Sequence, residues 1–145
     1  MARPEAWRLN LAAYPHTQTV QTRFQDLDVL GHLNNVAFAA LFETARTKFN
    51  REAELWGKRF SGRRAVVASQ EIHYLAEGSY PEDVEVATGI GPIGNRSWTI
   101  LAAMFQGGRP IATCDVVIVM DRDEDGSGMP APFRARLEEF GVRGA

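Results

Sequence analysis

The chain has 145 residues, of which 45% are hydrophobic and 23% charged, with a formal net charge of -2. This length and composition are typical of one globular domain, so we expect a single domain over residues 1–145. The small net charge and scattered basic residues argue against nucleic acid or an anionic membrane surface as a partner. No apolar run reaches the roughly 18 residues that cross a bilayer, and the first residues lack a secretory signal pattern. With one cysteine, these features favour a soluble protein of the reducing cytoplasm.

The first elements in the chain are an expected strand and a long expected helix. Residues Thr19 to Phe24 alternate in polarity as a half-buried strand does. From Asn34 or Asn35 the pattern becomes helical, with apolar residues three or four positions apart at Phe38, Phe42, Ala45, Phe49, Ala53 and Trp56. The first turns are apolar on nearly every side, so we expect the start of this helix to be buried all round.

Strand-like segments dominate the second half of the chain. They are rich in Val, Ile, Thr and aromatic residues and cover Ala65 to Leu75, Asp83 to Ile90, Ser97 to Phe105 and Ile111 to Asp121. The short turn clusters between them predict antiparallel hairpins, because parallel neighbours need a longer crossover. A short helix is expected from Pro132, with Gly141 as its stop. The order of elements therefore predicts an α+β domain, with one curved antiparallel sheet around a largely buried helix.

Two patterns that suggest chemistry are better explained by structure. The stretch GIGPIG, from Gly89 to Gly94, matches the GxGxxG pattern of dinucleotide sites, but a strand-like segment follows it instead of a helix. Without a helix start there is no cradle for a pyrophosphate, so we expect a hairpin turn. Cys114 lies in the middle of a strand with no adjacent histidine, and we expect a buried structural thiol.

Asp26, Asp28 and His32 raise the question of a metal site, because their side chains can meet on one loop. The other two histidines, His16 and His73, fall in the N-terminal arm and in a strand, so no further ligand set is evident. We therefore expect neither a metal nor another cofactor.

The stretch RFQDLDVLGHLNNVAF, from Arg23 to Phe38, holds the densest polar cluster and allows two interpretations. In the first, Asn34 or Asn35 caps the helix, Gly31 adopts a positive φ, and the aspartates favour the positive end of the helix dipole. In the second, a partly desolvated carboxylate faces the free N–H groups of a buried helix start, as an acyl-transfer site requires. The loop by itself leaves both interpretations open.

The same stretch resembles the signature of hotdog-fold acyl-CoA thioesterases of the 4-hydroxybenzoyl-CoA thioesterase type. The matching positions are an aromatic residue, two aspartates, Gly-His, Asn-Asn and a helical acidic residue followed by arginine: Phe24, Asp26, Asp28, Gly31, His32, Asn34, Asn35, Glu43 and Arg46. The segments EGSYPEDVEV and GNRSW, and the tail before the short helix, also look like this family. The resemblance thus covers nearly the whole chain.

The resemblance implies a five-stranded antiparallel sheet wrapped around a central helix, and a homodimer or homotetramer with acyl-CoA sites at subunit interfaces. It implies that Asp28 acts as general base or nucleophile and that the backbone N–H of Asn35 polarises the thioester carbonyl. Asp26 and His32 would then be supporting residues. Glu43 matches an acidic position of the motif, with a salt bridge or an interface as its expected role and catalysis as the lesser alternative.

For the substrate, the resemblance places coenzyme A near Asn95, Arg96 and Ser97, and Phe38 is a candidate for the acyl pocket. The implied activity is hydrolysis of an acyl-CoA thioester to the free acid and CoA. Two alternatives remain at this point: a hotdog protein that binds an acyl-CoA or an acyl carrier without cleaving it, and a thioesterase acting on acyl carrier protein.

Overall fold

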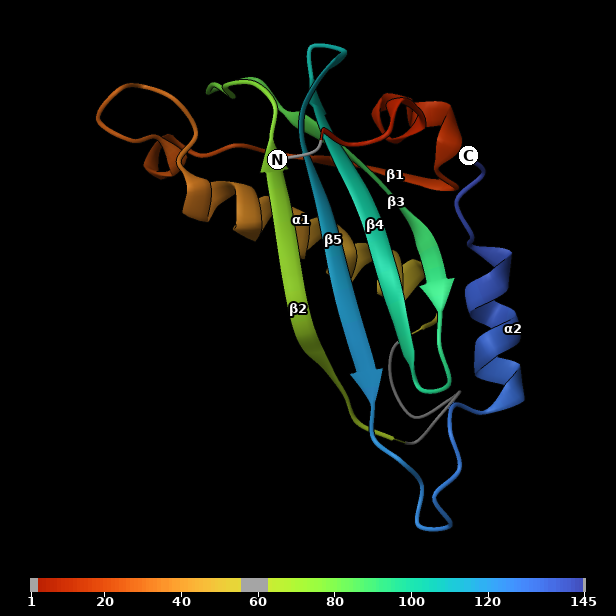
Figure 1. Ribbon diagram of the computed structural model, residues 1–145. Coiled ribbons are helices and arrows are strands. Elements are labelled where there is room, and N and C mark those ends of the chain that lie inside the picture. The colour runs from red at the N-terminus through yellow and green to blue at the C-terminus, as the bar shows by residue number, and fades with distance from the viewer. Residues whose placement is uncertain (1–2, 56–62, 145) are drawn as a thin grey trace.

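A computed structural model describes residues 3–55 and 63–144 (Figure 1). Its strands are β1 (His16–Val20), β2 (Ala65–Tyr74), β3 (Val84–Ile93), β4 (Ser97–Gln106) and β5 (Arg109–Met120). The α-helices are α1 (Asn35–Glu52) and α2 (Ala131–Glu139), and short 3-10 turns cover Ala6–Leu9, Leu11–Ala13 and Phe24–Asp26. The expected long helix, tail helix and strands are thus present, which confirms the α+β class. Trp56, assigned to the helical pattern, lies outside the described residues.

The five strands form one antiparallel sheet in the order β1-β3-β4-β5-β2. The hairpins β3–β4 and β4–β5 were expected and are present. The stretch GIGPIG, however, is mostly the irregular end of strand β3, which runs to Ile93, and only Gly94 lies in the turn. The connection EGSYPE is different, because β2 pairs with β5 at one edge while β3 lies between β1 and β4. Our expectation of a hairpin there was wrong: the segment crosses the end of the sheet, and β2 becomes an edge strand.

Helix α1 crosses one face of the sheet and supplies the core. Asn34 begins the helix as its N-cap, since its side-chain oxygen accepts a hydrogen bond from the N–H of Ala37 at 2.7 Å. Phe38, Phe42 and Phe49 point toward the sheet and are at most 3% exposed. Burying one such side chain contributes about 1.5–3 kcal/mol to folding. The packing of these three side chains therefore fixes the position of α1 relative to the sheet.

The start of α1 is not buried all round. Figure 1 shows the loop before α1, in orange, extending past the edge strand β2. Val36 is 72% exposed, and in the preceding loop Val29 and Leu30 are 102% and 75% exposed. The expectation from the apolar pattern is therefore wrong for a single chain, because no other segment covers the loop and the first turn of α1 where they pass the edge strand (Figure 1).

The expected strand from Thr19 to Phe24 is displaced toward the N-terminus. The observed β1 ends at Val20, and a 3-10 turn begins at Phe24. The cause is Asp26, whose carboxylate accepts hydrogen bonds from the backbone N–H of Arg23 at 2.9 Å and from its guanidinium Nη2 at 2.8 Å. These bonds turn the chain away from the sheet before the loop that carries Asp28.

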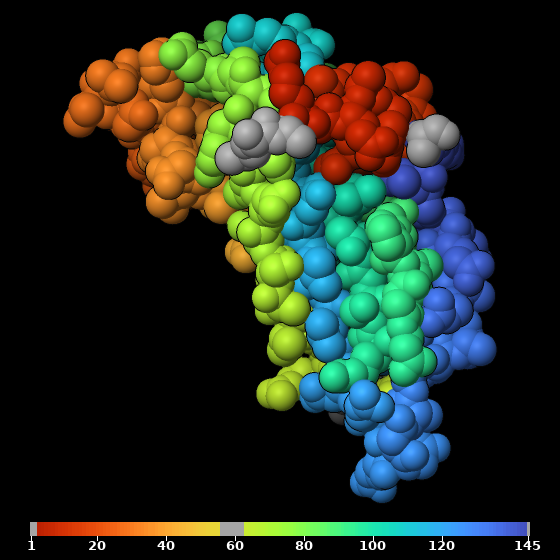
Figure 2. All heavy atoms as spheres, in the orientation of Figure 1, coloured from red at the N-terminus to blue at the C-terminus, as the bar shows by residue number. Residues whose placement is uncertain are grey.

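The outer face of the sheet has a second apolar cluster. Residues of the N-terminal arm, among them Tyr14 and the partly buried Trp7, pack on Leu101 and Phe105. The guanidinium of Arg8 donates to Asp115 Oδ1 at 2.8 Å and to the Tyr14 hydroxyl at 2.9 Å. Figure 2 shows the arm, in red, over one end of this face, while the rest of the face is uncovered.

Candidate active site

The loop from Leu27 to Leu33 is closed by its own backbone. Leu27 and Leu33 form an antiparallel bridge, and the N–H of Asp28 donates to the carbonyl of His32 at 2.8 Å. Gly31, at the tip, has a φ of 81°, which a residue with a side chain adopts only at a cost. The expected positive φ at Gly31 is therefore confirmed, and the loop is a compact unit that holds Asp28 in place.

Asp28 uses only part of its carboxylate for this loop. Its Oδ1 accepts from the N–H of Leu30 at 2.9 Å and from the N–H of His32 at 3.3 Å. Among the described residues, Oδ2 has no partner. The carboxylate is exposed in the single chain, which contradicts the expectation that it is partly desolvated. One oxygen is thus fixed by the loop, and the other is free to meet a substrate.

A hollow of about 520 Å³ joins this carboxylate to the start of α1. Its lining comes from the loop, the first turn of α1 and the end of β2, and includes Asp28, His32, Asn35, Phe38, Tyr74 and Glu77. The hydrogen bonds of the described residues assign no acceptor to the N–H of Asn35. A free N–H at a helix start favours an oxygen that carries negative charge. Asp28 and Asn35, whose N–H is a potential oxyanion donor, therefore line the same hollow.

His32 and Phe38 complete the walls of this hollow. His32 Nε2 lies 3.0 Å from Glu77 Oε2, so the imidazole is engaged at the rim. Phe38 is 3% exposed and meets Tyr74 edge to face, with ring centroids 5.2 Å apart. Gly78 lies behind the loop, where its carbonyl accepts from the N–H of Leu33 at 2.9 Å. A Cβ at Gly78 would lie 2.5 Å from the Cδ1 atom of Leu33, so a larger residue here would displace the Leu33 side chain.

Asp26 is near Asp28 in sequence but has a different environment. It is 3% exposed, and its carboxylate is occupied by the backbone and guanidinium of Arg23, while its carbonyl accepts from the N–H of Asn34. Asp26 and Asp28 are thus each bound to separate loop groups. The described residues contain no cluster of three or more His, Cys, Asp or Glu side chains placed to hold a metal.

Several predicted site residues lie away from this hollow. Glu43 is on α1, eight residues after Asn35 and therefore about 12 Å along the axis, with 73% of its side chain exposed. Asn95, Arg96 and Ser97 are at the β3–β4 hairpin, where Arg96 donates to the carbonyl of Met120 at 3.2 Å. This hairpin adjoins the Ala65 end of β2, whereas the hollow adjoins its Tyr74 end, roughly 30 Å away. One chain does not bring these groups together.

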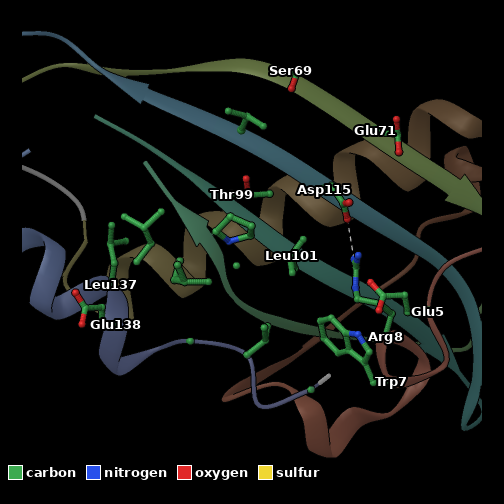
Figure 3. Close-up of a pocket in the computed structure, with 18 residues that line it drawn as sticks. Glu5, Trp7, Arg8, Ser69, Glu71, Thr99, Leu101, Asp115, Leu137 and Glu138 are labelled. Atoms are coloured by element: carbon green, nitrogen blue, oxygen red, sulfur yellow. Dashed lines mark hydrogen bonds and ion pairs between the residues drawn. The ribbon is translucent and has the colours of Figure 1, made fainter. Parts of the chain in front are cut away.

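A larger hollow, of about 890 Å³, is on the outer face of the sheet (Figure 3). Figure 3 shows the paired Arg8 and Asp115 at its wall, with Trp7 beside them. Arg8 is already bonded to Asp115, and none of the described residues lining the space is a nucleophile with an activating base. Cys114, on the opposite face of β5, is buried, and burial raises the pKa of its thiol to about 12. The smaller hollow, which holds Asp28, is therefore the candidate site.

A curved antiparallel sheet around a long helix, with an aspartate loop at the helix start, defines a hotdog fold of the thioesterase kind. A model of the thioesterase-like superfamily matches residues 22–139. The chain therefore belongs to the thioesterase-like superfamily, and its class is that of a thioester hydrolase. The match begins after the arm that covers the outer face.

Neither α1 nor α2, the α-helices among the described residues, has the length and apolar character of a membrane-spanning helix.

Similar proteins agree with this assignment. A predicted thioesterase from Bacillus stearothermophilus is 29% identical with a TM-score of 0.74, covering 89% of this chain and 98% of its own. A thioesterase from Thermus thermophilus, in complex with coenzyme A and zinc, is 26% identical with a TM-score of 0.75, covering 88% and 95%. The uncharacterized protein YsmA of Bacillus subtilis is 26% identical, covering 86% of this chain and 83% of its own.

Proposed function

We propose that this protein hydrolyses an acyl-CoA thioester to the free acid and CoA, with Asp28 as the reacting carboxylate. The observation that carries the proposal is the shared hollow of the Asp28 carboxylate and the unbonded N–H of Asn35. In this arrangement the thioester oxygen accepts a hydrogen bond from the Asn35 N–H, which stabilises the negative charge that develops on it. Coenzyme A in the similar Thermus thermophilus protein supports CoA as the thiol part of the substrate.

Two routes are open to Asp28. As a general base, its carboxylate accepts a proton from water while the water oxygen attacks the thioester carbon. As a nucleophile, it attacks that carbon itself and forms an anhydride, which water then hydrolyses. In both routes the C–S bond breaks and CoA leaves as a thiolate that takes up a proton. His32, paired with Glu77, orients the loop and takes no part in proton transfer.

We also propose that the protein is a dimer joined through β2. Most of the large apolar side chains that are exposed belong to this edge strand or to the loop and first turn of α1 beyond it: Val29, Leu30, Val36, Val66, Val67 and Tyr74. An edge strand with unpaired backbone groups and an apolar border is suited to pairing with another chain. A two-fold axis through β2 makes the two edge strands antiparallel, so each patch meets its own copy.

This dimer accounts for the dispersed site residues. In an antiparallel pair, the Tyr74 end of one β2 lies beside the Ala65 end of the other. The hollow around Asp28 then adjoins the partner's β3–β4 hairpin, which carries a second copy of Asn95, Arg96 and Ser97. These residues are placed to bind the CoA moiety, and the partner covers the exposed Asp28. The composite site also desolvates the carboxylate, as its chemistry requires.

The test is a thiol-release assay over short, long and aromatic acyl-CoAs, with the wild-type protein and Asp28→Asn. We expect thiol release by the wild type and a loss of roughly a hundredfold to ten-thousandfold in the variant. Circular dichroism of the variant should be unchanged, because asparagine retains an oxygen for the loop N–H groups. Equal turnover by the two proteins would refute the role of Asp28. Tight binding of every acyl-CoA without thiol release would indicate a binding protein instead.

A further inference from the structure

A second cavity, of about 490 Å³, lies between α1 and β2 on the helix side of the sheet. We call it the α1–β2 groove. Its apolar lining consists of Leu55, Ala65, Val66, Val67, Trp98, Ile118, Met120 and Phe133. Its polar residues are Glu43, Arg46, Thr47 and Asn50 of α1, together with Arg63 before β2. The volume is within the range that holds a small ligand, and a mostly apolar lining with a few polar groups is typical of such sites.

Arg46 is a buried cation in this groove with weak partners. Its side chain is only 11% exposed. Its guanidinium reaches Gln70 Oε1 at 3.5 Å and Glu43 Oε2 at 3.8 Å, and both distances are long for such pairs. A guanidinium carries five N–H donors, so most of the donor capacity of Arg46 is unused among the described residues. Glu43 is largely exposed and can turn to water, so it does not hold Arg46 tightly.

Trp98 supplies an apolar wall of the groove. It is 5% exposed, and its ring packs edge to face against Phe133, with centroids 5.0 Å apart. Its indole Nε1 has no hydrogen-bond partner among the described residues, but this atom is fully buried and does not open onto the groove. A buried donor with unused capacity costs free energy, and Arg46 is the weakly bound donor that an oxygen of a ligand in the groove can meet.

We infer that the α1–β2 groove binds an acyl group that ends in a carboxylate at the carbon most distant from the thioester. This inference rests on the proposed function, because the antiparallel dimer sets the Asp28 hollow of one chain beside the groove of the other. The methylene part of such a chain packs on the apolar lining. Its terminal carboxylate takes a forked pair of hydrogen bonds from Arg46, which a guanidinium makes well.

The test measures binding to Asp28→Asn, which holds substrate without rapid turnover. The probes are three six-carbon acyl-CoAs that end in a methyl group, a ketone or a carboxylate. We expect the carboxylate form to bind roughly ten- to a hundredfold more tightly than the methyl form, as hydrogen bonds to a charged group allow. Methyl- or ketone-ended probes that bind as tightly as the carboxylate would overturn the inference.

Additional variants in the Asp28→Asn background locate the effect. Arg46→Gln should remove most of the preference by weakening only the carboxylate form. Arg51→Gln, an exposed arginine on the same helix, should change nothing. Equal weakening of all three probes by Arg46→Gln would overturn the assignment. Binding is measured without hydrolysis, so the two proposals can fail separately. Absence of thiol release in the wild type would refute the proposed function, whereas the binding assay alone decides the preference for a terminal carboxylate.

Discussion

His32 Nε2 and Glu77 Oε2 lie 3.0 Å apart at the rim of the hollow that holds Asp28. The contact joins the loop that carries Asp28 to the segment that crosses the end of the sheet. Among the described residues, His32 is also the only imidazole that lines this hollow. Substitution of His32 therefore distinguishes a pair that positions the loop from a pair that transfers protons.

We predict that His32→Gln retains activity within about tenfold of the wild type, because glutamine can still donate to Glu77 and the loop N–H bonds to Asp28 remain. A general base lost from the reaction would cost a hundredfold or more. Steady-state kinetics across pH 5 to 9 measure this difference. Glu77→Gln is the matched variant and should have a similarly small effect. A loss with His32→Gln as large as that with Asp28→Asn would contradict the positioning role.

Asp26 should be a determinant of stability. Its carboxylate is 3% exposed and accepts three hydrogen bonds from Arg23. We predict that Asp26→Ala lowers the free energy of unfolding by about 2 kcal/mol, because the hydrogen bonds to a charged group are lost at a buried position. Urea denaturation measures this. Gln25→Ala, at an exposed neighbouring position, is the control and should leave the midpoint unchanged.

The edge strand β2 should decide the oligomeric state. Residues Ala65 to Gln70 are exposed in the single chain, including Val66 and Val67 at 47% and 51%. We predict that a double substitution of these valines by lysine gives a monomer with little thioesterase activity, because like charges then oppose each other across the two-fold axis. Sedimentation velocity and the thiol-release assay check both effects.

The opposite edge provides the control for this experiment. Thr17 and Thr19 are exposed positions on β1, and their double substitution by lysine should leave both mass and activity unchanged. A monomeric wild type with full activity would refute the composite site. Loss of the dimer with both pairs of substitutions would point to general destabilisation instead.

Cys114 should be inert in the native protein. Burial raises the pKa of its thiol to about 12, so at pH 8 only about one thiol in ten thousand is ionised, and the thiolate is the reactive form. We predict no reaction with a disulfide reagent at pH 8 over an hour and one equivalent after denaturation. Cys114→Ala should keep its catalytic rate. Rapid native labelling would show that the strand opens to solvent.

Much of the architecture followed from local patterns. The 3.6-residue spacing of Phe38, Phe42, Ala45 and Phe49 predicted α1, because one face of a helix must be apolar to pack on a sheet. The helix cap and the positive φ of Gly31 depend on the chemistry of single residues: the positive φ was predicted, and the cap was predicted as Asn34 or Asn35, of which the structure has Asn34. The DxD and GHxNN spacing indicated the site, and within it Asp28 and Asn35 do share one hollow.

Other properties depended on contacts between distant segments. The pattern could not reveal that β2 pairs with β5 at an edge, because a short connection fits a hairpin and a crossover at the sheet end equally well. The apolar start of α1 was also wrongly expected to be buried within one chain, because its burial depends on which distant segments lie beside it. The α1–β2 groove was not predicted, since Arg46 and Trp98 carry no signal of proximity in the sequence. Spacing along the chain determined which residues form helices, strands and caps, whereas the tertiary structure decided which polar groups lack partners, because that depends on every neighbour that packing supplies.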